Sequence, residues 1–152
     1  MKYNELLREA EKENLYIFEN ENIKRCKGLS IDNTISLSRT INNIKEKKCV
    51  LAEEIGHYKT TYGNILDQSK LQNRKEEYKG RAWAYKKLVP LEDLLEAYES
   101  DVKNRYELAD FLEITEEFLI EAIVYYRHKY GVYYKYQNYI IYFEPLGIAK
   151  KI

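Results

Sequence analysis

The sequence contains no long hydrophobic run and few cysteines. No stretch approaches the roughly 18 to 20 apolar residues that a membrane-spanning helix needs. The N-terminal segment MKYNELLREAEKEN is charged throughout and lacks the apolar core of a signal peptide. The 2 cysteines, Cys26 and Cys49, fit unpaired thiols in a reducing compartment better than a single disulfide. We therefore predict a cytoplasmic protein that does not contact a membrane.

The chain also has no net charge, with 25 Lys and Arg against 25 Asp and Glu. This balance removes the usual electrostatic argument for a nucleic-acid partner, so direct nucleic-acid binding is disfavoured without a local basic patch. With 152 residues, of which 45% are hydrophobic, the chain is long enough for one compact domain. Because no internal repeat or low-complexity linker divides it, we predict that residues 1–152 form a single domain.

The spacing of apolar residues predicts an α+β fold. In the first 90 residues it predicts a helix over 2–13, a strand over 15–18, a hairpin over 29–37 with its turn at Asp32-Asn33, and a helix over 40–58. A loop at Gly63-Asn64 and a polar stretch over 67–79 then lead into a helix through 82–88, which Pro90 ends. We interpret residues 1–90 as a core that combines helices with a small antiparallel sheet.

The remaining residues, 91–152, are predicted to form a helical region followed by one or more strands. Short helices are expected over 91–98 and 106–111, and a longer one over 115–126 with Thr115 as its N-cap. This order is similar to a helix-turn-helix unit, but Glu116 and Glu117 would face DNA phosphates with the wrong sign. We interpret the region as a packing or protein-binding unit that lies against residues 1–90, with the Tyr-rich segment 132–143 forming strand.

One segment carries residues typical of metal chemistry, Glu53-Glu54-Ile55-Gly56-His57. In a zinc peptidase helix of the His-Glu-x-x-His type, two ligands four residues apart point at one ion, and the Glu after the first ligand is the general base. Here Glu53 stands where the first histidine is expected, and a carboxylate oxygen can bind zinc at about 2.0–2.2 Å. Spacing alone leaves a second interpretation open, since Glu-Glu pairs near a His are common on solvated helices.

Longer motifs strengthen the metal interpretation. The run CVLAEEIGHYKTTYGNI and the later run EEYKGRAWAYKKLVPLEDLLEAY resemble the phage and mobile-element branch of the ImmA/IrrE metallopeptidase family. In that family a second helix has the form Glu-x-x-Ala-x-x-aromatic-Ala-x-x-Leu-x-Pro, and its leading Glu is the third ligand. This chain matches the pattern with Glu77, Trp83 and Pro90, and has Gly80 in place of the first Ala. The resemblance implies that Glu53, His57 and Glu77 are metal ligands and that Glu54 is the general base.

The resemblance also implies a zincin-like minimal metallopeptidase core and a function. The expected activity is that of a zinc-dependent, site-specific metallo-endopeptidase whose protein substrate is a phage-type helix-turn-helix repressor. Because a Glu-His-Glu set neutralises both charges of zinc, it would acidify a water molecule less than a His-His-Glu set. Mn²⁺ or another divalent ion is therefore a second candidate cofactor, and a weak or inactive protein that only binds the repressor is the alternative function.

Overall fold

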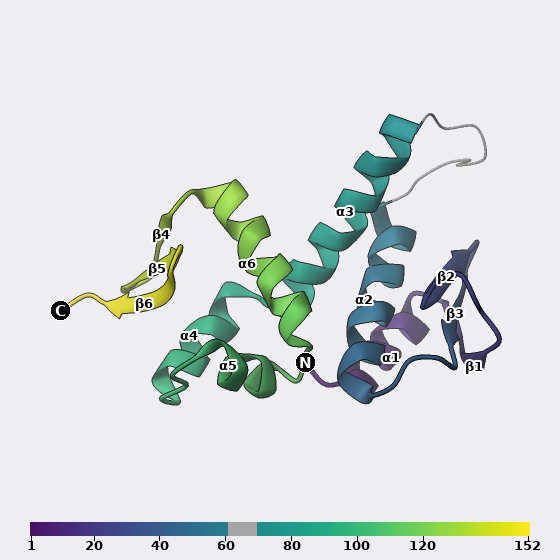
Figure 1. Cartoon of the computed structure of the whole chain (residues 1–152), viewed down its shortest axis with the longest axis horizontal. Coiled ribbons are helices and arrows are strands. Elements are labelled where there is room, and N and C mark those ends of the chain that lie inside the picture. Colours follow the sequence, from purple (N-terminus) through teal and green to yellow (C-terminus); the bar gives the residue numbers. More distant parts are fainter. Residues whose placement is uncertain (61–69) are drawn as a thin grey trace. The chain divides into compact units, whose positions relative to one another are not determined.

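A computed structural model describes residues 1–60 and 70–152, and the chain divides into two compact units (Figure 1). The N-terminal unit is Met1–Leu88 and the C-terminal unit is Val89–Ile152. The N-terminal unit contains α1 (Tyr3–Lys12), β1 (Tyr16–Glu21), β2 (Gly28–Ile31), β3 (Thr34–Ser38), α2 (Ile44–Thr60) and α3 (Lys70–Leu88). The combination of helices and small sheets confirms the predicted α+β class. The predicted loop at Gly63-Asn64 lies outside the described residues.

The N-terminal sheet has the strand order β1-β3-β2. Strands β2 and β3 pair antiparallel as the predicted hairpin, and Asp32 at its turn has a φ of 53°. Asx residues tolerate this left-handed geometry, which explains why the turn could be located from sequence. Strand β1 pairs with β3 in parallel, so the sheet is mixed and not wholly antiparallel. The sequence did not indicate this, because pairing between strands that are distant in the chain leaves no local signal.

The core of this unit lies between α1, the sheet and α2. Leu6 from α1, Ile35 and Leu37 from β3, and Leu51 and Ile55 from α2 are almost completely buried. Each such side chain contributes roughly 1.5–3 kcal/mol when it leaves water. Because Leu51 and Ile55 of α2 pack into the core, the opposite side of this helix faces away from it.

Two details of the α2 and α3 boundaries differ from the sequence prediction. Helix α2 begins at Ile44 and not near Thr40, because the Asn43 side chain caps it by accepting a hydrogen bond from the Glu46 amide at 2.9 Å. Helix α3 begins at Lys70, within the polar stretch that was expected to precede it. Its residues 74–79 are mostly exposed, so this part of the helix shows no apolar periodicity.

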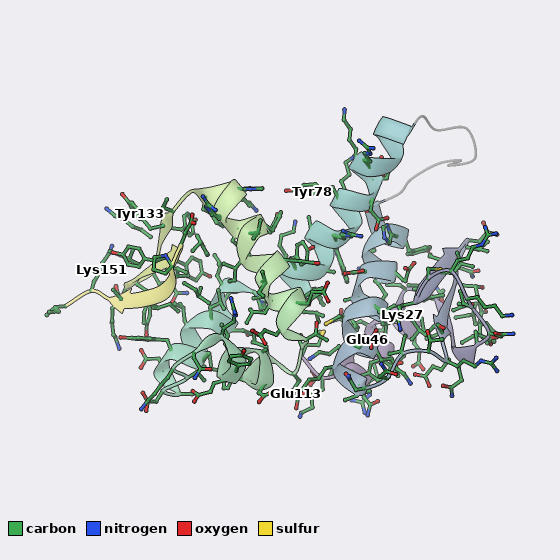
Figure 2. The ribbon with its side chains drawn as sticks, viewed as in Figure 1. Lys27, Glu46, Tyr78, Glu113, Tyr133 and Lys151 are labelled. Atoms are coloured by element: carbon green, nitrogen blue, oxygen red, sulfur yellow. The ribbon has the colours of Figure 1, made fainter. Side chains whose placement is uncertain are left out.

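Strand β2 is tied to the start of α2 by an ion pair. Lys27, directly before β2, lies 3.6 Å from Glu46 and donates a hydrogen bond to the Thr40 carbonyl at 3.1 Å (Figure 2). These contacts join the residue before β2 to the first turn of α2 and to the segment that leads into it.

The C-terminal unit contains α4 (Leu91–Glu99), α5 (Arg105–Leu112) and α6 (Glu116–Tyr130), followed by a meander of β4 (Tyr133–Tyr136), β5 (Tyr139–Phe143) and β6 (Leu146–Lys150). The predicted cap is confirmed, since the Thr115 hydroxyl accepts a hydrogen bond from the Phe118 amide at 3.1 Å. Stacked rings join α6 to the meander, with the Tyr130 and Tyr134 centroids 4.0 Å apart. No helix among the described residues is long and apolar enough to cross a membrane.

Candidate metal centre

The residues of the Glu53 to His57 segment lie on the middle of α2. Ile55 and Gly56 are buried within the unit, whereas Glu53, Glu54 and His57 are half-buried on the helix surface. The four-residue spacing places Glu53 and His57 about one turn apart on one side of the helix. The segment is therefore held by the core and still presents its three polar side chains partly to solvent.

The structure brings His57 and Glu77 together from two different helices. The Nε2 atom of His57 lies 3.2 Å from Oε2 of Glu77. The other carboxylate oxygen of Glu77 accepts a hydrogen bond from Nε of Arg81, also at 3.2 Å, one turn later on α3. Arg81 was not identified from sequence, although an acidic residue four positions before a basic one on a helix is a recognisable pair. It orients the carboxylate that faces the imidazole.

Glu54 has an unusual environment for a carboxyl group. Its burial, followed by the nearby charges of Glu53 and Glu77, raises the pKa of Glu54 from 4.5 to about 7. A carboxyl group that exchanges its proton near neutral pH has the property required of a general base or acid.

Two glycines allow α2 and α3 to approach each other at this site. A Cβ atom on Gly56 would lie 2.2 Å from the Gly80 carbonyl oxygen, a separation that only glycine permits. A Cβ atom on Gly80 would lie 2.6 Å from Nδ1 of His57. Gly80, which stands where the resembling family has Ala, therefore leaves the space that the imidazole occupies one turn after Glu77.

A third glycine places strand β2 against Glu54. A Cβ atom on Gly28 would lie 2.8 Å from Cγ of Glu54 and 2.8 Å from a methyl group of Val50. The first residue of β2 thus contacts the side chain of the candidate base. Sequence reasoning did not single out Gly28, which directly precedes the predicted hairpin, because the contact depends on how β2 and α2 pack.

The pair of His57 and Glu77 fits a divalent ion such as zinc. Two ligands of one tetrahedral zinc ion, each bound at about 2.0–2.1 Å, are separated by roughly 3.3 Å, close to the 3.2 Å between Nε2 and Oε2. Among the described residues, however, no three His, Cys, Asp or Glu side chains are gathered as a complete metal site. The structure pairs His57 with Glu77 and does not show Glu53 joined to them.

Glu76 is a second carboxylate of α3 that sequence reasoning did not single out. Its Oε2 atom is buried without a hydrogen-bond partner among the described residues, while its Oε1 atom lies 3.7 Å from Nζ of Lys79. Glu77, and not Glu76, faces His57, in agreement with the position expected for the third ligand. A substitution of Glu76 can therefore serve as the control for the same substitution of Glu77.

Comparison with known proteins identifies the family. No curated protein and no solved structure matches the chain. A family model, the IrrE N-terminal-like domain of peptidase M78, matches residues 4–123. This match covers most of the chain, including both helices of the candidate centre and helices α4 and α5. The chain therefore belongs to the IrrE N-terminal-like family of metallopeptidase-related proteins.

Proposed function

We propose that this protein is a zinc-dependent metallo-endopeptidase that cleaves a helix-turn-helix repressor at a specific site. The observation that carries the proposal is the pairing of His57 with Glu77 beside Glu54, a half-buried carboxyl group with a raised pKa. Membership of a peptidase family supports a protein as the substrate. The repressor and the cytoplasmic location are inferences from the sequence.

Glu53, His57 and Glu77 would hold the ion, which when bound polarises a peptide carbonyl and acidifies a water molecule. In the proposed reaction Glu54 accepts a proton from the attacking water as its oxygen bonds to the carbonyl carbon. The C–N bond then breaks, and Glu54 returns the proton to the leaving amine.

The edge of β2 offers a place for the substrate backbone. Strand β2 is at one edge of the sheet, and its Gly28 touches the Glu54 side chain. A segment that adds as a further strand at this edge would lie beside the candidate base. Larger residues at position 28 would separate the strand from α2, so Gly28 supports the proposed substrate position.

The experiment compares wild type with a Glu54→Gln variant. Purified protein should contain one divalent ion per chain, and it should cleave a co-expressed phage-type helix-turn-helix repressor. The Glu54→Gln variant should retain the ion and lose cleavage by a factor of about 10² or more, because the amide cannot accept the proton. Equal cleavage by both proteins would refute the role of Glu54.

The second candidate function is a protein that binds the repressor without cleaving it. Glu53 favours this candidate, because a second carboxylate ligand leaves less positive charge to activate water. If wild type and Glu54→Gln both bind the repressor with equal affinity and neither cuts it, the protein is a binding module. Binding followed by cleavage in wild type alone would support the peptidase.

We also infer that residues 91–152 pack on residues 1–90 as one domain. The sequence has no Gly- or Ser-rich linker between these two segments. Calorimetry of the whole chain should then show one cooperative thermal transition. Two separate transitions would mean that the N-terminal and C-terminal units unfold independently.

A further inference from the structure

A groove lies between α1 and β1. Its volume is about 600 Å³, and its lining includes Glu11, Tyr16, Ile17, Phe18 and Glu19. The lining comes from α1, the turn after it and the first four residues of β1. None of these residues belongs to the candidate metal centre.

The groove follows an unpaired strand edge. In the strand order β1-β3-β2, β1 and β2 occupy opposite edges of the sheet. The Tyr16 amide donates a hydrogen bond to the Asn33 carbonyl at 2.9 Å, on the side of β3. Successive residues of a strand direct their amide and carbonyl groups to opposite sides. The backbone amide and carbonyl groups of Ile17 therefore point away from β3. These groups are available to another extended chain.

The groove also exposes large aromatic side chains. Tyr16 is 61% exposed and Phe18 is 50% exposed, and both project from the same face of β1 because they are two residues apart. A long edge strand with exposed apolar residues is usually covered or protected by charge. Here the exposed rings and the free edge occur in the same segment, which favours an apolar and extended occupant.

The charged side chains that line the groove, among the described residues, are negative. Among the described residues that line it, two are charged, Glu11 and Glu19, and both are acidic. Lys47 lies 3.9 Å from Glu19, which also accepts a hydrogen bond from the Tyr3 hydroxyl, whereas Glu11 has an exposed side chain at the end of α1. An occupant with lysine or arginine between its apolar residues would complement the exposed Glu11 carboxylate and add to the contacts that Lys47 and Tyr3 make with Glu19.

We propose that this groove binds an extended segment of a partner protein, in which apolar residues alternate with lysine or arginine, as an added strand at the free edge of β1. The backbone of the segment pairs with Ile17, its apolar side chains contact Tyr16 and Phe18, and its basic side chains lie beside Glu11 and Glu19. This docking site lies at the sheet edge opposite β2. It operates whether or not the protein hydrolyses peptides.

The test measures binding of a fluorescein-labelled nonapeptide of alternating valine and lysine to the Glu54→Gln protein by fluorescence anisotropy. Glu54→Gln prevents hydrolysis, so failure of the proposed peptidase activity does not affect the result. Two control peptides are used, one with glutamate in place of lysine and one with N-methyl groups on alternate amides. Both should bind at least tenfold more weakly, because they remove charge complementarity and strand pairing respectively.

Protein variants locate the binding. Ile17→Pro removes an outward amide that β3 does not use, and should weaken binding at least tenfold relative to Ile17→Val. Glu11→Lys should weaken it more than Glu96→Lys, which makes the same charge change at an exposed position of α4. Circular dichroism confirms that each variant is folded, and the N-methylated peptide gives an answer that requires no variant.

Three results would overturn the proposal. The first is equal binding of the methylated and unmethylated peptides, and the second is binding unaffected by both Ile17→Pro and Glu11→Lys. The third is a dimer in sedimentation experiments that Ile17→Pro converts to a monomer, which would assign the β1 edge to a second copy of this chain.

Discussion

The two units of the chain differ in charge and in how their elements are held together. Met1–Leu88 has 18 Lys and Arg against 13 Asp and Glu, whereas Val89–Ile152 has 7 against 12, so net charges of +5 and −5 cancel over the whole chain. The N-terminal unit joins α2 to α3 through glycines in backbone contact. The C-terminal unit joins α6 to β4 and β5 through stacked aromatic rings.

This difference indicates where the chemistry lies. In the N-terminal unit the close helix approach brings polar side chains from α2 and α3 to one place, with a carboxyl group of raised pKa among them. In the C-terminal unit the acidic residues are mostly exposed on the helices, and the tyrosines pack on each other. We therefore expect substitutions in the N-terminal unit to affect both stability and metal chemistry, and substitutions in the C-terminal unit to affect stability alone.

The prediction with the largest expected effect compares one glycine from each unit. Gly56→Ala would place a Cβ atom 2.2 Å from the Gly80 carbonyl oxygen, so α2 and α3 must separate. We expect a loss of about 3 kcal/mol or more in the free energy of unfolding, measured with urea. The control is Gly147→Ala in β6, where a Cβ atom has no neighbour within 4 Å and the change should stay within about 0.5 kcal/mol. Equal effects at the two positions would remove the distinction between the units.

The second prediction concerns the pH dependence of metal-free protein. Folding raises the pKa of Glu54 from 4.5 to about 7, so the folded state favours the protonated form. Stability from this group is present below pH 4.5 and is lost as pH rises towards 7, by an amount on the order of 3 kcal/mol. In EDTA-treated protein, the Glu54→Gln variant should not show this loss of stability when thermal unfolding is measured between pH 4.5 and 7.

In the C-terminal unit, the pKa of Glu92 shifts in the opposite direction from that of Glu54. The Tyr136 hydroxyl lowers the pKa of Glu92, which is exposed. Its contribution is therefore present above pH 4.5 and decreases as the solution becomes more acidic, and it is small because solvent screens the group. If Glu54→Gln left the loss of stability between pH 4.5 and 7 unchanged, Glu54 would not be its source.

The third prediction concerns the space beside His57. Gly80→Ala would place a methyl group 2.6 Å from Nδ1, so the imidazole must shift from its position beside Glu77. Because the clash involves a side chain that can move, we expect little change in stability but about tenfold weaker zinc binding, measured by titration calorimetry. Ala82→Gly, on the same helix, controls for the change in helix propensity. Unchanged zinc affinity in Gly80→Ala would show that His57 does not depend on this space.

The smallest expected effect is in the C-terminal unit. The Tyr126 hydroxyl donates a buried hydrogen bond to the Val89 carbonyl at 2.8 Å. Tyr126→Phe should destabilise the protein by about 1–2 kcal/mol and leave zinc affinity unchanged, whereas Tyr133→Phe, on an exposed ring, should change neither stability nor zinc affinity. A fall in zinc affinity with Tyr126→Phe would contradict the functional separation of the two units.

Local signals in the sequence were sufficient for several parts of this fold. Thr115 was recognised as a helix cap and Asp32-Asn33 as a turn, because both depend on residues adjacent in the chain. The placement of Glu77 opposite His57 was predicted from a family resemblance, which carries information about contacts between distant residues. The role proposed for Glu53 as a ligand remains a prediction.

The remaining features depend on long-range packing. Nothing near β1 in the chain indicates that it pairs in parallel with β3, and the polar start of α3 has no apolar stripe. The sequence shows Gly56 and Gly80 but not that their backbones meet. The same limit applies to Glu54, whose pKa rises because of burial that only the assembled helices and β2 provide.

The central claim, that α2 and α3 together hold a divalent ion, is tested most directly by zinc titration calorimetry of metal-stripped protein. Wild type is compared with Glu77→Gln and with Glu76→Gln, which makes the same change one residue earlier. We predict one zinc ion per chain for wild type and Glu76→Gln, and binding roughly 100-fold weaker or lost in Glu77→Gln, with all three proteins folded. Equal zinc affinity in the three proteins, or no binding to wild type, would contradict the claim.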